Sequence, residues 1–387
     1  MRISNMTNSA AFVCGERKFE MEGAWILGKP TTLDAAIAEA GKLISASTKI
    51  LIAGLGTDVA GARAAISLAR RTGAIVDHMN AEGVLRDLDV MRSSGVMMTT
   101  PTECHIRADT LLLAGPIRGA ARNQLLQHVI GSDPAKAAHR REIFWLCPGR
   151  DLLTLAETIA ATPIGREQDD LAGVLAALRA QIIGRPTGKA IVSSKRLRQV
   201  AATLKQTRFG TAIWSGAELH PLAIEMLCGL VNDLNATTRF SGLPLAPEDD
   251  AIGVLHVCGW MTGFPMRTSF SRRFFHHDPW LFDSRRLALN GEVDCVVWIS
   301  AYKNEAPPWR CGPPTIALTA QGTAFHTPAQ VHINVGCPGI DHPGVQHLAA
   351  TGTLSACTAA RPTATISVAD AISRISATTS GPELRPC

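Results

Sequence analysis

The residues with the most evident chemical potential lie between positions 267 and 278. Three arginines, Arg267, Arg272 and Arg273, come before the adjacent histidines His276 and His277. Guanidinium groups receive carboxylates through paired hydrogen bonds, so the arginines form a candidate site for an anionic ligand. Adjacent histidines suggest zinc, but neighbouring side chains in an extended segment point to opposite sides and rarely share one metal. We therefore favour anion binding over a zinc site.

Two further patterns could bind ligands, and both have ordinary structural explanations. His78 and Glu82 stand four residues apart, which would place an imidazole and a carboxylate side by side on a helix. Such pairs are more often solvated or helix-capping residues than metal ligands. Gly54 and Gly56 resemble the start of a dinucleotide-binding turn, but the third glycine of that fingerprint would fall at Val59. A tight turn with close packing of strand and helix is the simpler interpretation.

The sequence shows no catalytic machinery of a common type. The motifs G-x-S-x-G, H-E-x-x-H and the P-loop are absent. The formal charge of +5 is not collected into basic runs, so we do not expect nucleic-acid binding. No stretch approaches the roughly 18 apolar residues of a membrane helix, and the first residues lack a signal peptide's apolar segment. Ten scattered cysteines without a C-x-x-C pair indicate a cytoplasmic protein with reduced thiols.

Strands and helices alternate along the chain, which is typical of parallel, doubly wound sheets. Short apolar runs predict strands at residues 49–53, 74–76, 110–113, 144–146, 210–214, 252–257, 294–299, 314–318 and 331–335. Apolar residues at helical spacing predict helices at residues 31–40, 58–71, 221–235 and 368–375, and a mostly helical stretch at 151–208. The fold class is therefore α/β, with two Rossmann-like βαβ halves and mostly parallel sheets.

The 387 residues, 46% of them hydrophobic, are enough for more than one domain. We expect a lead at residues 1–48, a first Rossmann-like domain at 49–150 and a helical insert at 151–208. A second Rossmann-like domain at 209–340 and a C-terminal tail at 341–387 complete this division, and the tail is a candidate docking segment.

One pair of segments resembles a known family. The sequences GAIVDHMNAEG at 73–83 and ECHIRADTLLLAG at 103–115 are similar to a strand–loop–helix–strand region in the B subunit of formylmethanofuran dehydrogenase, a molybdenum or tungsten bis-pterin protein. In that family the region carries a metal-binding cysteine, which an ungapped count from Arg107 places at Gly83. The family also holds a [4Fe–4S] cluster with four N-terminal cysteines, whereas only Cys14 occurs in the first hundred residues here.

A second region supports the same resemblance. The sequence WMTGFP at 260–265 is similar to a family segment that precedes an arginine of the metal pocket, and His276 stands at that arginine's position. The sequence GIDHPG at 339–344 resembles the stretch that closes over the pterin, but the arginine that follows it in the family is missing. The resemblance implies a degenerate molybdopterin-oxidoreductase fold. It marks Cys14, Gly83 and His276 as degenerate cofactor positions, so we expect both the Mo/W pterin and the [4Fe–4S] cluster to be lost.

These losses favour a related assembly, the bacterial formyltransferase/hydrolase complex of one-carbon metabolism in methylotrophs, whose B subunit this chain resembles. The resemblance implies conversion of formyl-tetrahydromethanopterin, through a formyl-methanofuran analogue, to formate. The partners would be a zinc amidohydrolase-like A subunit, which performs the hydrolysis, and the C and D subunits. The B subunit would be a non-redox, structural component without catalytic residues. It would bind the coenzyme's anionic glutamate tail through Arg267, Arg272, Arg273 and His276.

Two alternatives stay open. An active Mo/W-bis-pterin formylmethanofuran dehydrogenase subunit would need a different metal ligand, such as Cys104, or pterin dithiolenes alone. A plain Rossmann-like binding module would hold an unrelated ligand in its crevice.

Overall fold

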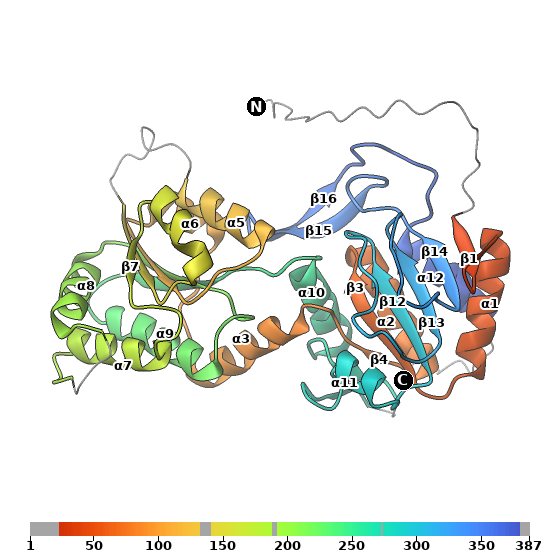
Figure 1. The fold of residues 1–387 in the computed structure, drawn as a ribbon, viewed down its shortest axis with the longest axis horizontal. Helices are drawn as coiled ribbons and strands as arrows, with labels where there is room; N and C mark the ends of the chain where they lie inside the picture. Colours follow the sequence, from red (N-terminus) through yellow and green to blue (C-terminus); the bar gives the residue numbers. More distant parts are fainter. Residues whose placement is uncertain (1–22, 132–140, 188–191, 272–273, 380–387) are drawn as a thin grey trace.

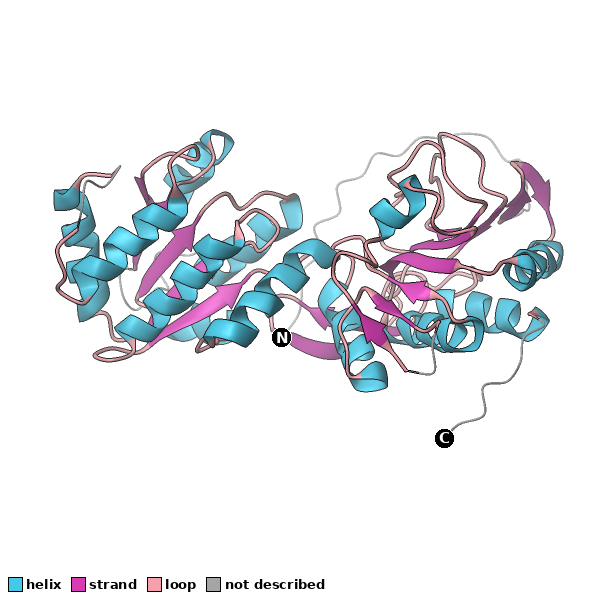
Figure 2. Cartoon of the chain, turned by 90° about the horizontal axis from the view of Figure 1, so that it is seen from below, coloured by secondary structure: helices cyan, strands magenta, loops and turns pink. Residues whose placement is uncertain are grey.

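The computed structural model describes residues 23–131, 141–187, 192–271 and 274–379. These residues form two lobes that lie side by side along the long axis of the molecule, each built on its own sheet (Figure 1, Figure 2). Helix α3 (Ala81–Ser94) lies where the two lobes meet (Figure 1). None of the described helices is both long and apolar enough to cross a bilayer.

The large lobe contains a nine-stranded sheet in the order β11-β10-β4-β3-β12-β13-β14-β1-β2. The five strands from β4 to β14 pair in parallel, and antiparallel pairs close both edges. The strands are β1 (Ala24–Ile26), β2 (Lys29–Thr31), β3 (Ile50–Gly56), β4 (Ile75–Val76), β10 (Thr268–Ser269), β11 (His276–His277), β12 (Cys295–Ser300), β13 (Thr315–Thr319) and β14 (Val331–Asn334).

Helices cover both faces of this sheet because its central strands are apolar on both sides. One core includes buried side chains of α1 (Leu33–Ala46), α2 (Val59–Thr72), α10 (Ala251–Thr262) and α12 (Val368–Thr378). The other face packs Trp298 and Trp309 against α11 (Ser284–Leu289). Gly54 is required in β3 because a Cβ there would stand 2.4 Å from the carbonyl oxygen of Ile299 in β12. The close approach at Gly54 is therefore between two strands, and not between strand and helix as expected.

The small lobe contains a fully parallel five-stranded sheet in the order β7-β6-β5-β8-β9. Its strands are β5 (Thr110–Ala114), β6 (Glu142–Leu146), β7 (Thr162–Ile164), β8 (Gly210–Trp214) and β9 (Phe240–Pro244). Leu112 and Leu111 face opposite cores, as alternate residues of a strand must. The helices are α4 (Pro101–Arg107), α5 (Ala120–Ile130), the 3₁₀ turn η1 (Arg150–Leu152), α6 (Leu153–Thr158), α7 (Leu171–Ile182), α8 (Ser194–Gln206) and α9 (Pro221–Leu234).

The predicted α/β class with mostly parallel sheets is confirmed. One predicted strand is wrong, because residues 252–257 lie in helix α10. Its buried residues Ala251, Val254, Val257 and Cys258 recur at helical spacing, and a short apolar run cannot by itself separate a buried strand from a buried helix.

The strands of each lobe do not come from one continuous stretch of chain, whereas the expected domain boundaries lay at residues 150 and 209. Residues 210–244 add β8 and β9 to the small lobe, whereas residues 50–76 add β3 and β4 to the large lobe. Residues 151–208 contribute β7, α7 and α8 to the small lobe. Each sheet is completed by strands that return after long excursions of the chain, and local sequence patterns carry no information about such pairings.

Described residues beyond position 341 pack onto the two lobes. The hairpin of β15 (Gly344–Leu348) and β16 (Thr353–Cys357) extends from the large lobe toward the small lobe (Figure 1). Its turn reaches α4, where the Thr102 hydroxyl donates a hydrogen bond to the Ala350 carbonyl. Helix α12 then returns to the large lobe and buries four apolar side chains in that lobe's core.

Candidate functional site

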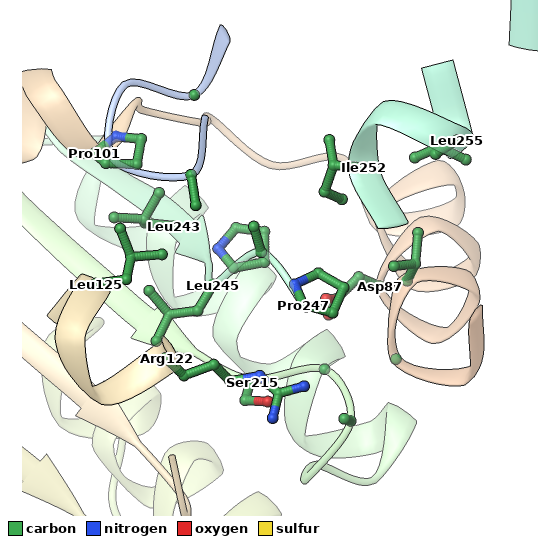
Figure 3. Close-up of a pocket in the computed structure, with 18 of the residues that line it drawn as sticks. Asp87, Pro101, Arg122, Leu125, Ser215, Leu243, Leu245, Pro247, Ile252 and Leu255 are labelled. Atoms are coloured by element: carbon green, nitrogen blue, oxygen red, sulfur yellow. The ribbon is translucent and has the colours of Figure 1, made fainter. Parts of the chain in front are cut away.

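A cavity of about 240 Å3 lies where the lobes meet, and α3, α5, α10 and the β15–β16 hairpin all contribute to its wall (Figure 3). Most of its lining is apolar. The labelled apolar side chains in Figure 3 are Pro101, Leu125, Leu243, Leu245, Pro247, Ile252 and Leu255. The cavity is also lined by Gly83, the position that the sequence predicts to correspond to the family's metal-binding cysteine.

Packing at Gly83 leaves no room for a side chain. A Cβ built on this residue would stand 2.7 Å from the backbone nitrogen of Ala217 and 3.0 Å from its Cα. Real Cβ atoms essentially never approach other atoms this closely, and backbone atoms cannot move aside as a flexible side chain can. The segment after β8 therefore closes the space that a ligating thiolate at this position would occupy.

Five polar side chains interrupt the apolar wall, namely Asp87, Thr99, Arg122, Ser215 and His347. Asp87 of α3 accepts a hydrogen bond of 2.7 Å from the indole nitrogen of Trp214, and burial raises its pKa to about 7. The hydroxyl of Ser215 is buried and has no hydrogen-bond partner among the described residues. The Nε of Arg122 is also buried and unpartnered there, while its Nη1 donates to the carbonyl of Arg118 at 2.9 Å. Figure 3 shows Arg122 and Ser215 at the same end of the cavity.

Arg267 lies outside this cavity and is already surrounded by carboxylates. Its Nη1 lies 3.0 Å from Glu82, its Nη2 2.6 Å from Asp283 and its Nε 3.4 Å from Asp77. Burial raises the pKa of Asp77, and the charge of Arg267 partly opposes that shift. Because its Nη atoms pair with Glu82 and Asp283 and its Nε lies beside Asp77, Arg267 holds the β10–β11 region to the N-terminal part of α3.

The other residues of the predicted anion site are only partly described. Arg272 and Arg273 lie outside the described residues. His276 is exposed on β11 at the edge of the large sheet, with its ring against Phe282. His277 packs against Phe264, and its Nδ1 lies 2.9 Å from the Arg267 carbonyl oxygen. The two histidines thus have different neighbours, and the described residues contain no group of three metal-binding side chains.

His78 and Glu82 do not form a pair. His78 precedes α3 and is buried, and its Nδ1 accepts a hydrogen bond from the backbone N–H of Asn80. Its Nε2 lies 3.1 Å from the Asp249 carbonyl oxygen, and burial lowers the pKa of His78 to about 4. A neutral ring that donates from Nε2 satisfies both contacts. Glu82 is instead partly exposed and pairs with both Arg86 and Arg267, each at 3.0 Å.

The residues do not fit a metal held by a cysteine thiolate. Cys104, the alternative ligand, is fully buried in a core of the small lobe, and burial raises the pKa of its thiol to about 11. Cys104 also does not line the cavity, so its thiol is not placed to ligate a metal there. Cys14, the expected remnant of the cluster region, lies outside the described residues.

Sequence reasoning did not identify the polar residues of the cavity. Asp87, Arg122 and Ser215 come from three separate elements, and none belongs to a motif with characteristic spacing. The only available signal was a carboxylate on the apolar side of α3, between Val84 and Val90.

Comparisons with known proteins give one consistent answer. No family model matches the chain. It is 31% identical over 322 residues to the B subunit of the formyltransferase/hydrolase complex Fhc of Methylorubrum extorquens, a match that covers 82% of this chain and 85% of the relative. It is 23% identical over 286 residues to the B subunit of the tungsten-containing formylmethanofuran dehydrogenase 2 of Methanocaldococcus jannaschii, covering 70% of this chain and 65% of that protein.

A solved structure extends the likeness to three dimensions. A chain in the crystal structure of the formyltransferase/hydrolase complex FhcABCD from Methylorubrum extorquens, determined with methylofuran, superposes with a TM-score of 0.81 at 30% identity. The match covers 92% of this chain and 98% of the other. The family that the sequence motifs predicted is thereby confirmed: this chain belongs to the family formed by the B subunits of formyltransferase/hydrolase complexes.

Proposed function

We propose that this chain is the non-redox B subunit of a cytoplasmic formyltransferase/hydrolase complex. With a zinc amidohydrolase-like A subunit and the C and D subunits, it would convert formyl-tetrahydromethanopterin, through a methanofuran analogue, to formate. The single observation that supports the non-redox role is the packing of Gly83 against the Ala217 backbone, which leaves no room for a thiolate at position 83. Membership in the family supports the assembly. The eight described cysteines are free thiols, in keeping with a reducing compartment.

The test is purification of the complex from its native host, with molybdenum, tungsten and iron measured by mass spectrometry and oxidised pterin by fluorescence. We expect co-purification of all four subunits and none of these cofactors in stoichiometric amount. Stoichiometric metal together with pterin would refute the non-redox role and favour the dehydrogenase alternative. Purification of this chain without the other subunits would refute the assembly.

Within this role we propose that the 267–276 region receives the coenzyme's glutamate tail. Arg272, Arg273 and His276 would contact its carboxylates, and Arg267 would support them by fixing this segment through Asp77 and Asp283. Position supports this assignment, because β11 is the outermost strand and His276 is exposed.

Charge reversal tests the tail site. Replacing Arg272 and Arg273 by glutamate should weaken binding of the long-tailed coenzyme more than binding of a form with a truncated tail. Equal weakening of the two forms would remove the tail from the explanation. Arg92→Glu is the control, since Arg92 is an exposed arginine of α3 whose ion-pair partner among the described residues is Asp89.

A further inference from the structure

The cavity between the lobes has the properties of a small-molecule site. It is lined mostly by apolar side chains, and two of its polar groups, those of Arg122 and Ser215, lie at one end, which is a usual composition of ligand pockets. Its volume of about 240 Å3 lies just below the roughly 300–1,000 Å3 typical of pockets for drug-sized ligands. The cavity therefore suits a compact ligand, and it is too small for a bis-pterin cofactor.

Two buried hydrogen-bonding groups at this end lack partners. Ser215 is 1% exposed, and its hydroxyl forms no hydrogen bond with any described residue. The Nε–H of Arg122 is likewise unpartnered among the residues that the structure describes. Buried polar groups in folded proteins are almost always hydrogen-bonded, so a pair of unsatisfied groups at one cavity wall indicates a ligand that supplies the missing atoms.

The charge at this end defines the ligand's head group. No described carboxylate forms an ion pair with Arg122. Glu248 lies near enough for the Arg122 charge to help lower its pKa, but its carboxylate is paired with Lys303. Asp87 also lines the cavity, and its raised pKa of about 7 reduces repulsion of an incoming anion. A guanidinium and a hydroxyl together match the oxygens of a carboxylate. The leucine, isoleucine and proline side chains around them match an apolar body.

We propose that this cavity binds a small monocarboxylate with an apolar body, held by Arg122 and Ser215. The assignment goes beyond the proposed function and does not depend on assembly of the complex. Benzoate is the probe, because it combines one carboxylate with a compact apolar ring. Benzamide has the same shape without the charge, and glutarate has a polar body with a second carboxylate.

The experiment measures probe binding to the purified full-length chain by calorimetry, with 4-fluorobenzoate followed by fluorine NMR. We expect saturable binding of benzoate, and binding of benzamide and glutarate that is weaker by about tenfold or more. Arg122→Gln should weaken benzoate binding by about tenfold or more, and Ser215→Ala by a smaller factor. Ala246→Trp, which fills the cavity from its wall, should abolish it.

Arg92→Gln is the matched control, because it removes the same charge from the exposed face of α3 and should leave binding unchanged. Circular dichroism verifies that each variant is folded, and Arg122→Lys replaces Arg122→Gln if the latter does not fold. Absence of saturable benzoate binding would overturn the proposal. So would equal affinity for benzoate and benzamide, or unchanged binding in the Ala246→Trp variant.

Discussion

Replacing Gly83 by alanine adds a single carbon at the position that the sequence predicts to correspond to the family's metal-binding cysteine. The new Cβ would stand 2.7 Å from the Ala217 nitrogen and 3.1 Å from its Cβ, so either α3 or the segment after β8 must move. Overpacking of this kind costs about 1–3 kcal/mol. Alanine also favours a helix over glycine by roughly 0.5–1 kcal/mol, which offsets part of that cost.

A second glycine allows the steric cost to be isolated. Gly259 lies in α10 with no atom within 4 Å of its built Cβ, so Gly259→Ala gains the helix preference without a collision. The difference between the two variants therefore estimates the contact alone, about 1–3 kcal/mol. We expect Gly259→Ala to raise the free energy of unfolding and Gly83→Ala to lower it or leave it near that of the wild type.

The assay is urea unfolding followed by circular dichroism, with thermal midpoints as a second measurement. A difference of 1 kcal/mol corresponds to about 2–4 °C for a unit of 150–250 residues. Equal stabilisation by the two substitutions would refute the reasoning, because the segment at Ala217 would then yield freely. Position 83 could in that case accept a side chain, and the steric argument against a metal ligand would fail.

Three further predictions concern buried groups. Cys104→Ala should leave formyl hydrolysis by the assembled complex near the wild-type rate, since this thiol lies in a core; loss of activity in an intact complex would contradict us. Arg267→Met should cost about 3–5 kcal/mol of stability because it leaves the buried Asp77 carboxylate without its cation. Arg92→Met, at an exposed ion pair, should cost at most about 1 kcal/mol. Burial raises the pKa of Asp87 from 3.8 to about 7, so the stability that the protonated carboxyl contributes below pH 4 is lost as the pH rises to 7. Asp87→Asn should therefore make the thermal midpoint less dependent on pH between pH 5 and 8. The same pH dependence in the variant and the wild type would refute this.

Local sequence patterns were sufficient to predict the α/β class and most central strands. Strands such as β3 and β12 are apolar on both faces and are bounded by turns, so their existence follows from composition. The pairing of β5 with β8, across about a hundred residues, does not follow from any local pattern. Edge strands β10 and β11 contain two residues each, which is too short for a period to be recognised.

The candidate site was predictable only at the level of single positions. The absence of a cysteine at Gly83 was visible in the sequence, but the contact with Ala217 joins residues 134 positions apart and requires the structure. Arg267 was predicted to receive a ligand's carboxylates because the sequence does not reveal its partners. In the structure, Asp77, Glu82 and Asp283 surround it.

We propose that the absence of a thiol and the closed space at position 83 are two parts of one structural change. Restoring a cysteine alone would place its Cβ against backbone atoms of Ala217, so the thiolate could reach the cavity only if the segment after β8 also moved. That segment begins at Ser215, whose hydroxyl faces the same cavity as Asp87 and Arg122. A thiolate at position 83 would therefore also require a change in the segment after β8. The cavity has its own unsatisfied hydrogen-bonding groups at Ser215 and Arg122, and we expect these groups to select the molecules that it binds.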